Sequence, residues 1–253
     1  MPLQALLFDV DGTLADTERD GHRIAFNAAF RDYGLDWDWD VALYGKLLAV
    51  TGGKERIKYY LHEFRPDYIP PKNFDDLVVK LHGAKTGHYI RQLEQGEIPL
   101  RPGVKRLLTE ARDAGLRLAI ATTTTPANVS ALLKYSLAAD AEDWFEVIAA
   151  GDIVPAKKPA SDIYFWAMQQ MRLSAADCFA FEDSANGIRS SADAGIKTLV
   201  TVNDYTVDHD FNGAVSVVSD LGEPHAPSRI LQGSLNGQSY VNLEAVYGWY
   251  EST

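Results

Sequence analysis

The chain has 253 residues, of which 46% are hydrophobic and 23% are charged, a composition typical of a folded globular protein. The 35 acidic residues outnumber the 24 basic ones and give a net charge of −11, which argues against binding to nucleic acid or to anionic lipid. No stretch approaches the roughly 20 apolar residues of a membrane-spanning helix, and the single cysteine, Cys178, excludes an internal disulfide.

Short apolar runs recur along the chain, and most of them are continuously apolar rather than alternating. Such runs are typical of strands in a parallel sheet that is covered on both faces. The segments between them have helical punctuation: Gly115 and Gly195 follow two of them, and Thr125-Pro126 and Lys158-Pro159 place a proline where a helix would begin. The predicted strands are 5–8, 116–121, 147–150, 178–181, 196–202 and 215–218.

Strands that alternate with helices predict an α/β fold with a doubly wound, mostly parallel, Rossmann-like sheet. Residues 16–96 break this alternation, because they show helical periodicity and no convincing strand. We therefore predict two domains, a core formed by residues 1–15 plus 97–253 and an inserted helical cap formed by residues 16–96. The tail after Gly222 is irregular, with one short helix predicted at 243–250.

Two carboxylates directly follow the first predicted strand, in the run Phe8-Asp9-Val10-Asp11-Gly12-Thr13. The carboxyl ends of parallel strands are where α/β folds bind ligands. In an extended chain Asp9 and Asp11 share a face, and two like charges so close need a cation or a proton between them. A turn or capping role explains one such aspartate, but it explains the pair poorly.

Hydroxyls and a lysine follow the next two strands. The run from Thr122 to Thr125 precedes a helix N-terminus, where hydroxyls and backbone N–H groups suit a phosphoryl oxygen; Thr125 is the expected N-cap. Lys157 and Lys158 follow the third strand. A lysine at the start of a helix gains nothing from the helix dipole, so it is better explained by a bound anion, and we favour Lys158 for this role.

The fourth strand ends in a second acidic pair, Glu182-Asp183, followed by Ser184 as a helix cap. Because the carboxyl ends of parallel strands meet at one edge, we expect all of these groups to converge. Carboxylate oxygens are the ligands that Mg²⁺ prefers. A carboxylate nucleophile, Mg²⁺, a lysine and a hydroxyl together indicate phosphoryl transfer.

These segments resemble the four signature motifs of the haloacid dehalogenase (HAD) superfamily of hydrolases: Asp9 to Thr13, Thr122, Lys158 and Glu182-Asp183. The helical insertion after the first motif resembles the subclass I cap of the β-phosphoglucomutase-like branch. The resemblance implies a Mg²⁺-dependent phosphatase that works through an aspartyl-phosphate.

The resemblance also implies a role for each motif residue. Asp9 would be the nucleophile, and Asp11 would protonate the leaving oxygen and then activate the hydrolytic water. Thr122 and Lys158 would hold the transferring phosphoryl group, and Thr13 would shape the loop. The implied Mg²⁺ ligands are Asp9, Asp11 through its backbone carbonyl, Asp183, and Glu182 directly or through water.

The cap segment is expected to decide the substrate. Gly52-Gly53 allows close backbone approach at a helix start beside Lys54, and its position resembles the specificity loop of the branch; an ordinary helix start is the alternative. Glu18 and His22 are four residues apart and share a helix face. The predicted substrate-binding residues are Glu18, His22, Tyr44, Gly52, Gly53, Lys54, Arg65, Thr123 and Thr124, with Arg65 proposed for a second phosphate because arginine binds phosphate bidentately.

Residues 16–18, 51–56 and 121–125 resemble the CbbY-type phosphatases of this branch, which act on xylulose-1,5-bisphosphate, an inhibitor of Rubisco. We therefore expect an enzyme that removes one phosphate from this sugar. The N-terminus has no signal-peptide pattern and the chain has no heptads, so a cytoplasmic monomer is expected. The alternatives are a β-phosphoglucomutase-type sugar phosphomutase, against which Thr13 and the Gly-Gly loop argue, and another small-molecule phosphatase such as one for phosphoglycolate. A non-catalytic member of the fold is disfavoured by the intact motif set.

Overall fold

The computed structural model describes residues 2–252, which divide into two compact units. The first unit joins residues 2–16 to 99–252, and we call it the core. The second unit, residues 17–98, is called the cap. None of the helices in the described residues is long and apolar enough to cross a lipid bilayer.

The core is built on a seven-stranded sheet of order β3-β2-β1-β4-β5-β6-β7 within the described residues. All neighbours from β3 to β6 are parallel, as predicted, whereas β7 runs antiparallel to β6 at the edge and was not predicted. The strands are β1 (Ala5–Phe8), β2 (Arg117–Ala121), β3 (Val147–Ala149), β4 (Cys178–Glu182), β5 (Lys197–Thr201), β6 (Ser216–Val218) and β7 (Ile230–Gln232).

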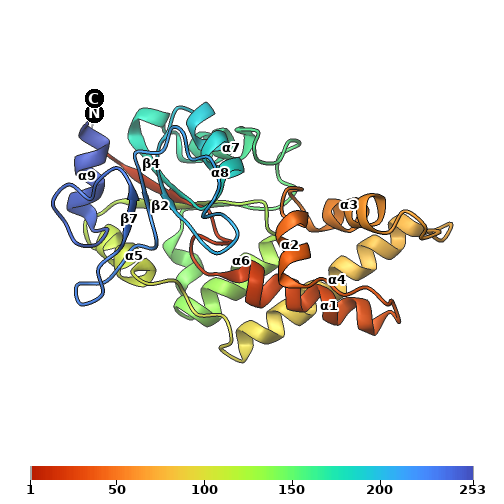
Figure 1. Ribbon diagram of the computed structural model, residues 1–253. Coiled ribbons are helices and arrows are strands. Elements are labelled where there is room, and N and C mark those ends of the chain that lie inside the picture. The colour runs from red at the N-terminus through yellow and green to blue at the C-terminus, as the bar shows by residue number, and fades with distance from the viewer. Residues whose placement is uncertain (1, 253) are drawn as a thin grey trace. The chain divides into compact units, whose positions relative to one another are not determined.

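Helices cover both faces of this sheet (Figure 1). On one face, α7 (Asp162–Met171) packs on small side chains such as Ala119 and Ala180, and α8 (Ala185–Asp193) lies next to it. On the other face lie α5 (Val104–Asp113) and α9 (Leu243–Glu251), with Phe179 of β4 stacked on Trp249 of α9. This two-sided burial explains why the strands are continuously apolar. The shorter elements of the core are α6 (Pro126–Leu132), a π-helical turn (Leu133–Leu137) and two 3₁₀ turns (Ala141–Trp144 and Ala175–Asp177).

The prediction that Lys158-Pro159 opens a helix is wrong, because α7 begins only at Asp162. The Lys158-Pro159 peptide is cis, and Pro159 lies in the turn that precedes the helix. Lys158 is therefore a loop residue, and its side chain is buried at the sheet edge.

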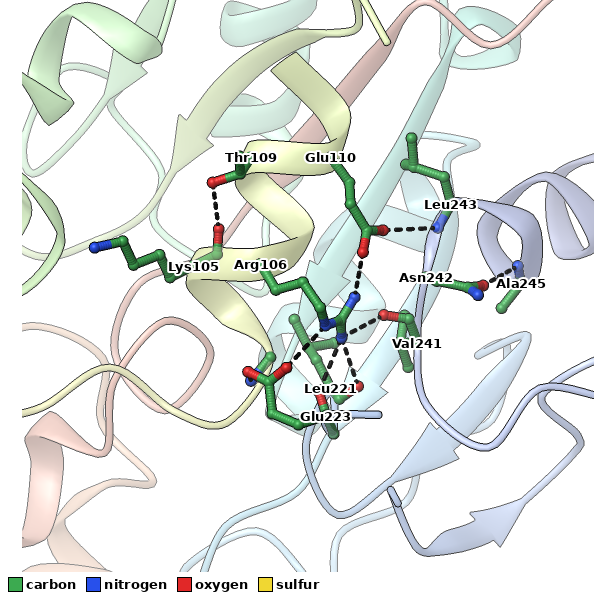
Figure 2. Close-up of polar contacts among 12 residues, drawn as sticks. Lys105, Arg106, Thr109, Glu110, Leu221, Glu223, Val241, Asn242, Leu243 and Ala245 are labelled. Carbon is green, nitrogen blue, oxygen red and sulfur yellow. Dashed lines mark hydrogen bonds and ion pairs between the residues drawn. The ribbon is translucent and has the colours of Figure 1, made fainter. Parts of the chain in front are cut away.

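Arg106 of α5 is one of the side chains that bond the C-terminal segment, residues 223–252, to the rest of the core (Figure 2). Its guanidinium donates to Glu223 at 3.0 Å and to Glu110 at 2.9 Å, and it lies over the ring of Tyr240. It also donates to the backbone carbonyls of Leu221, Gly222 and Val241. The tail is irregular as predicted, but it is bonded to the sheet domain at several points.

The cap is helical throughout its regular structure. A π-helical turn (Glu18–His22) runs directly into α1 (Arg23–Asp32), and the other helices are α2 (Val41–Leu47), α3 (Gly53–Phe64) and α4 (Phe74–Glu94). Their interior is aromatic: Phe26 and Phe30 of α1 contact the buried ring of Trp39. Asn27 exchanges two hydrogen bonds with the backbone of Trp39, which fixes the segment between α1 and α2. Gly52, just before α3, has φ +99°, a conformation that favours glycine.

Candidate active site

Three adjacent strands of the core deliver polar side chains to one place. β1, β2 and β4 are neighbours and parallel, so their carboxyl ends lie side by side. Asp9 follows β1, Thr122 follows β2, and Glu182 and Asp183 lie at the end of β4. All four side chains are buried. The convergence that the strand pattern predicts is therefore present in the core.

Lys158 lies at the centre of these groups. Its Nζ atom donates to Oδ1 of Asp9 at 2.7 Å and to Oε1 of Glu182 at 2.6 Å. The segment after β3 therefore carries this lysine across β2 to reach the end of β1. Thr13 adds a long hydrogen bond of 3.4 Å to the other oxygen of Asp9. Lys157, the alternative, instead pairs with Asp152 at 3.0 Å, outside this cluster.

The site has more negative than positive charge. Burial raises the pKa of Asp9 well above its usual value, and although Lys158 acts to lower it, Glu182 and Asp183 raise it further. Burial and the charge of Glu182 raise the pKa of Asp183 to about 7. Burial disfavours the charge on Lys158, but Asp9 and Glu182 outweigh it, so its pKa is raised. Three buried carboxyl groups and one ammonium thus need further positive charge to be ionised together.

These carboxylates fit a divalent cation. One oxygen each from Asp9, Glu182 and Asp183 lies within 4.8 Å of the others. Oε2 of Glu182 is buried and has no hydrogen-bond partner among the described residues. A set of buried oxygen ligands is what Mg²⁺ prefers, and nitrogen or sulfur ligands of the zinc type are missing from the set.

Gly12 packs directly against the acidic cluster. Its φ is +86°, and an added Cβ would lie 2.2 Å from Oδ2 of Asp183 and 2.6 Å from the amide nitrogen of Asn203. Asn203 itself donates to Oδ2 of Asp183 at 2.7 Å. Asn203 was not predicted, although it lies just after β5 and the strand-end rule applied one strand further would have found it. The side chain of Asp11 is half-buried beside this loop.

The threonine run after β2 divides into different roles. Thr122 is buried and its hydroxyl accepts from the backbone N–H of Thr124 at 3.3 Å. Asn128 of α6 donates to the hydroxyl of Thr124 at 3.0 Å, and Thr123 is half-buried. Thr125 occupies the N-cap position of α6, but its side chain makes no capping hydrogen bond. By contrast, Ser184 caps α8, because its hydroxyl accepts from the N–H of Gly187.

Arg101 donates hydrogen bonds to backbone carbonyls next to the site. No sequence signal distinguished it from an ordinary arginine before a Pro-Gly turn. It is 8% exposed. Its Nη2 lies 2.5 Å from the carbonyl of Val202 and 2.6 Å from that of Ser219. It also contacts the carbonyls of Gly12 and Thr201 and the carboxylate of Asp16. One side chain thereby ties the loop after Asp11 to the ends of β5 and β6.

In the cap, two of the predicted residues meet around an arginine that was not predicted. Tyr44 donates to Oε2 of Glu18 at 2.5 Å, and Arg56 donates to the hydroxyl of Tyr44 at 2.7 Å. Arg56 also lies 3.4 Å from Oε2 of Glu18 and over the ring of Tyr44. Arg56 is buried and lies one turn into α3. From the sequence alone, an arginine at this position would be interpreted as a solvent-exposed helix residue.

A second group in the cap combines His22 and Lys54 with His82 and Lys85 of α4, and we call these four residues the cap cation cluster. His22 contacts the ring of Tyr89 at 4.2 Å, and buried Lys85 lies 5.3 Å from the centre of the same ring. Burial and the charges of Lys85 and Lys54 lower the pKa of His82 to about 4. His82 and Lys85 are three residues apart on one helix and therefore lie on the same face, and this spacing was the sequence signal that could have identified the pair.

The Gly-Gly pair lies against this cluster. An added Cβ on Gly53 would lie 2.7 Å from the ring of His82, so glycine permits the start of α3 to approach α4. Arg65 lies elsewhere, at the end of α3, and its guanidinium makes a double contact with Asp36 at 3.2 and 3.1 Å. The structure therefore brings Gly53 toward the cluster, whereas Arg65 is held in a pair at the surface.

Comparisons with known proteins identify the family of this chain. A family model described as haloacid dehalogenase-like hydrolase matches residues 3–195. Over 252 residues the chain is 44% identical to protein CbbY, encoded on a plasmid of Cupriavidus necator, and the match covers 99% of this chain and 98% of the relative.

Solved structures of CbbY from Rhodobacter sphaeroides have the same fold. The complex with phosphate matches at a TM-score of 0.80 and 43% identity, over 86% of this chain and 94% of that one. A variant with an Asp-to-Asn substitution, in complex with xylulose-1,5-bisphosphate, matches at a TM-score of 0.80 and 42% identity over the same shares, 86% and 94%. The strand-end carboxylates, the buried lysine and these matches agree: the chain belongs to the haloacid dehalogenase-like hydrolase family and is a phosphatase of the CbbY type.

Proposed function

We propose that this enzyme hydrolyses xylulose-1,5-bisphosphate to xylulose 5-phosphate and inorganic phosphate, with Mg²⁺ as its cofactor. The observation that carries the chemistry is the buried cluster of Asp9, Lys158, Glu182 and Asp183. The support for the substrate is the match to a CbbY structure that contains this sugar bisphosphate.

The reaction follows from the groups in the core. An oxygen of Asp9 attacks the phosphorus, and the bond from phosphorus to the sugar oxygen breaks, which leaves an aspartyl-phosphate. Asp11 gives its proton to the departing sugar oxygen and then takes a proton from the water that attacks the aspartyl-phosphate. Lys158 and Thr122 hold the phosphoryl oxygens throughout. Asp9, Asp183, Glu182 and the backbone carbonyl of Asp11 would hold Mg²⁺, which would supply positive charge to the phosphoryl group.

A bisphosphate has a second phosphate that is not transferred. We propose the cap cation cluster as the part of the cap suited to binding a phosphate, because Lys85 and Lys54 place positive charge beside His82. Lys85 is buried between the rings of Phe26 and Tyr89. Arg65 was the sequence-based candidate for this role. Its guanidinium already makes a double contact with the carboxylate of Asp36, which argues against this role.

The first experiment measures phosphate release, with and without Mg²⁺, from xylulose-1,5-bisphosphate, ribulose-1,5-bisphosphate, phosphoglycolate and β-glucose 1-phosphate. We expect Mg²⁺-dependent hydrolysis with the highest kcat/KM for the first compound. A flat profile, or conversion of β-glucose 1-phosphate to glucose 6-phosphate, would overturn the proposed substrate in favour of a broad phosphatase or a mutase. In Asp9→Asn, phosphate release should be lost while the thermal unfolding midpoint is retained.

The second phosphate site is tested by comparing Lys85→Met with Arg65→Met. Lys85→Met should raise KM for the bisphosphate by at least tenfold, since a charge-assisted contact contributes about 1.5–3 kcal/mol, while KM for a monophosphate changes little. Arg65→Met should leave both values near those of the wild type. The reverse result would restore Arg65 as the second phosphate ligand.

A further inference from the structure

The hydroxyl of Tyr164 lies against the buried carboxylate of Glu182, although no motif includes this tyrosine. Tyr164 is on α7 and fully buried. Its hydroxyl donates to Oε1 of Glu182 at 2.5 Å. The same oxygen accepts from Nζ of Lys158 at 2.6 Å, and that ammonium lies 5.3 Å from the centre of the tyrosine ring. Tyr164 thus contacts both the carboxylate and the lysine of the site.

This arrangement gives the two oxygens of Glu182 different environments. Oε1 has two strong donors, Tyr164 and Lys158. Oε2 is buried and has no hydrogen-bond partner among the described residues, and Glu182 offers one of the carboxylate oxygens that could hold a cation. An added Cβ on Gly187 would lie 1.9 Å from Oε2, so the carboxylate has no room to rotate on that side. The tyrosine therefore helps to reserve one oxygen of Glu182 for the cation or its water.

Packing alone does not account for the hydroxyl. The other buried side chains of α7, such as Ile163, Ala167 and Met168, are apolar and contribute to one hydrophobic cluster with the sheet. A phenylalanine at position 164 would fill the same volume without the cost of burying a polar group. Among the contacts that the structure shows for this hydroxyl, the hydrogen bond to Glu182 is the one that offsets the cost of its burial.

The geometry points to Tyr164 as a positioning residue for phosphoryl transfer: its hydroxyl holds Glu182 so that Oε1 accepts from Lys158 and Oε2 faces the cation. Lys158 is oriented by the same contact, because it shares Oε1 with the tyrosine and bridges to Asp9. Without the hydroxyl, the carboxylate turns toward the lysine alone, and both the cation site and the Lys158–Asp9 contact lose their geometry. The inference rests on the proposed Mg²⁺-dependent hydrolysis, but not on the identity of the sugar.

The test is Tyr164→Phe, which removes one oxygen atom. Partners that orient a metal ligand typically contribute 10–100-fold to metal affinity or activity, so we expect kcat to fall by at least about tenfold with KM for the sugar phosphate within a factor of about two. Binding of Mg²⁺ alone, measured by competition with Mn²⁺ in electron paramagnetic resonance, should weaken by a similar factor. Wild-type enzyme measured in parallel separates the two failures. A wild type without Mg²⁺-dependent hydrolysis overturns the proposed function, whereas an active wild type with an unimpaired Tyr164→Phe variant overturns only this inference.

Tyr250→Phe is the control, because it also removes a tyrosine hydroxyl that donates a hydrogen bond, here to the carbonyl of Ala176 outside the site. This variant should retain wild-type kcat and Mg²⁺ affinity. If Tyr164→Phe lowers only the unfolding midpoint and leaves kcat and Mg²⁺ affinity of the folded enzyme unchanged, the hydroxyl is merely structural and the inference is wrong.

A double-mutant cycle shows whether Tyr164 acts through Glu182. In a Glu182→Ala background, Tyr164→Phe should cause no further loss of Mg²⁺ affinity, because the group it positions is gone. Losses that multiply independently in the double variant would overturn the inference even if the single variant is impaired.

Discussion

At the scale of single residues, the site depends on a few side chains whose charges are not balanced within the protein. Asp183 shows this most directly, because its carboxyl group is buried beside Glu182 and its pKa is raised to about 7. In the metal-free enzyme this carboxyl therefore holds a proton below about pH 7, whereas Mg²⁺ requires the carboxylate. At the proposed Mg²⁺ site, protons and the cation would therefore compete for the same group near neutral pH.

This competition predicts a pH-dependent metal affinity. Because a group with a pKa of about 7 goes from mostly protonated at pH 6 to mostly ionised at pH 8, the apparent affinity for Mg²⁺ should rise by about tenfold over that range. The raised pKa also means that the metal-free protein loses stability as pH rises from the unfolded value of Asp183 through about 7, and Mg²⁺ restores it. Unfolding midpoints at pH 6 and pH 8, with and without Mg²⁺, measure both effects. Equal stabilisation by Mg²⁺ at the two pH values would contradict them.

At the scale of elements, the start of α8 shows how a helix shapes the site. Ser184 caps the helix, and Gly187 in its first turn packs against the carboxylate of Glu182 at the end of β4. Both features lie in the first turn, so the cap and the glycine together set how closely the helix approaches the strand end. The sequence predicts the cap from the serine before the helix, but nothing local marks this glycine as special, because Glu182 contacts it only in the folded chain.

Gly187→Ala should therefore disrupt the site. The added methyl group would overlap Oε2 of Glu182. The carboxylate cannot move away easily, because Lys158 and Tyr164 both donate hydrogen bonds to its other oxygen, Oε1. We therefore expect a stability loss of about 1–3 kcal/mol and a fall in kcat. Denaturant unfolding and phosphate release measure the two effects. Gly83→Ala in α4 is the matched control, because no atom lies within 4 Å of its added Cβ. It should stabilise the protein by about 0.4–1 kcal/mol; similar destabilisation by both changes would show that steric overlap is not the cause.

At the scale of the whole molecule, the core must hold a long C-terminal segment that contributes only one edge strand and one helix. Arg106 joins α5 to this segment through the carboxylate of Glu223 and the carbonyls of Gly222 and Val241 (Figure 2). Arg101 has a comparable position closer to the site, where it binds the carbonyls at the ends of β5 and β6. These two arginines replace regular sheet and helix hydrogen bonds where the chain is irregular.

Arg106→Met should loosen the C-terminal segment. It keeps most of the side-chain length but removes charge-assisted hydrogen bonds worth about 1.5–3 kcal/mol each, so we expect a loss of a few kcal/mol and faster proteolysis of residues 223–252. Arg19→Met is the control, since Arg19 forms a surface ion pair with Asp20 that contributes at most about 1 kcal/mol. Cleavage rates that are the same in the two variants would show that Arg106 does not hold the segment.

The sequence by itself determined the class of fold and the chemical groups of the core. Continuously apolar runs predicted strands that are buried on both faces, and the carboxyl ends of parallel strands have to meet at one edge of their sheet. The strand pattern alone therefore placed Asp9, Thr122 and Glu182 together, as the strand order confirms. The edge strand β7 escaped prediction, because it is only three residues long and exposed. The helix start expected at Pro159 was wrong. The preference of proline for the first helical position is a local property, and it does not account for the loop that buries Lys158.

Only the tertiary structure decided which polar groups meet across the sequence. Tyr164 with Glu182, Asn203 with Asp183, and Arg101 with the loop at Gly12 are pairs whose members lie far apart in the chain. In the cap, the same applies to Arg56, His82 and Lys85, whereas Arg65, chosen from its residue type, is paired with Asp36. The physical reason is that hydrophobic periodicity and strand ends are local properties, while the partner of a buried charge is set by which elements pack against each other.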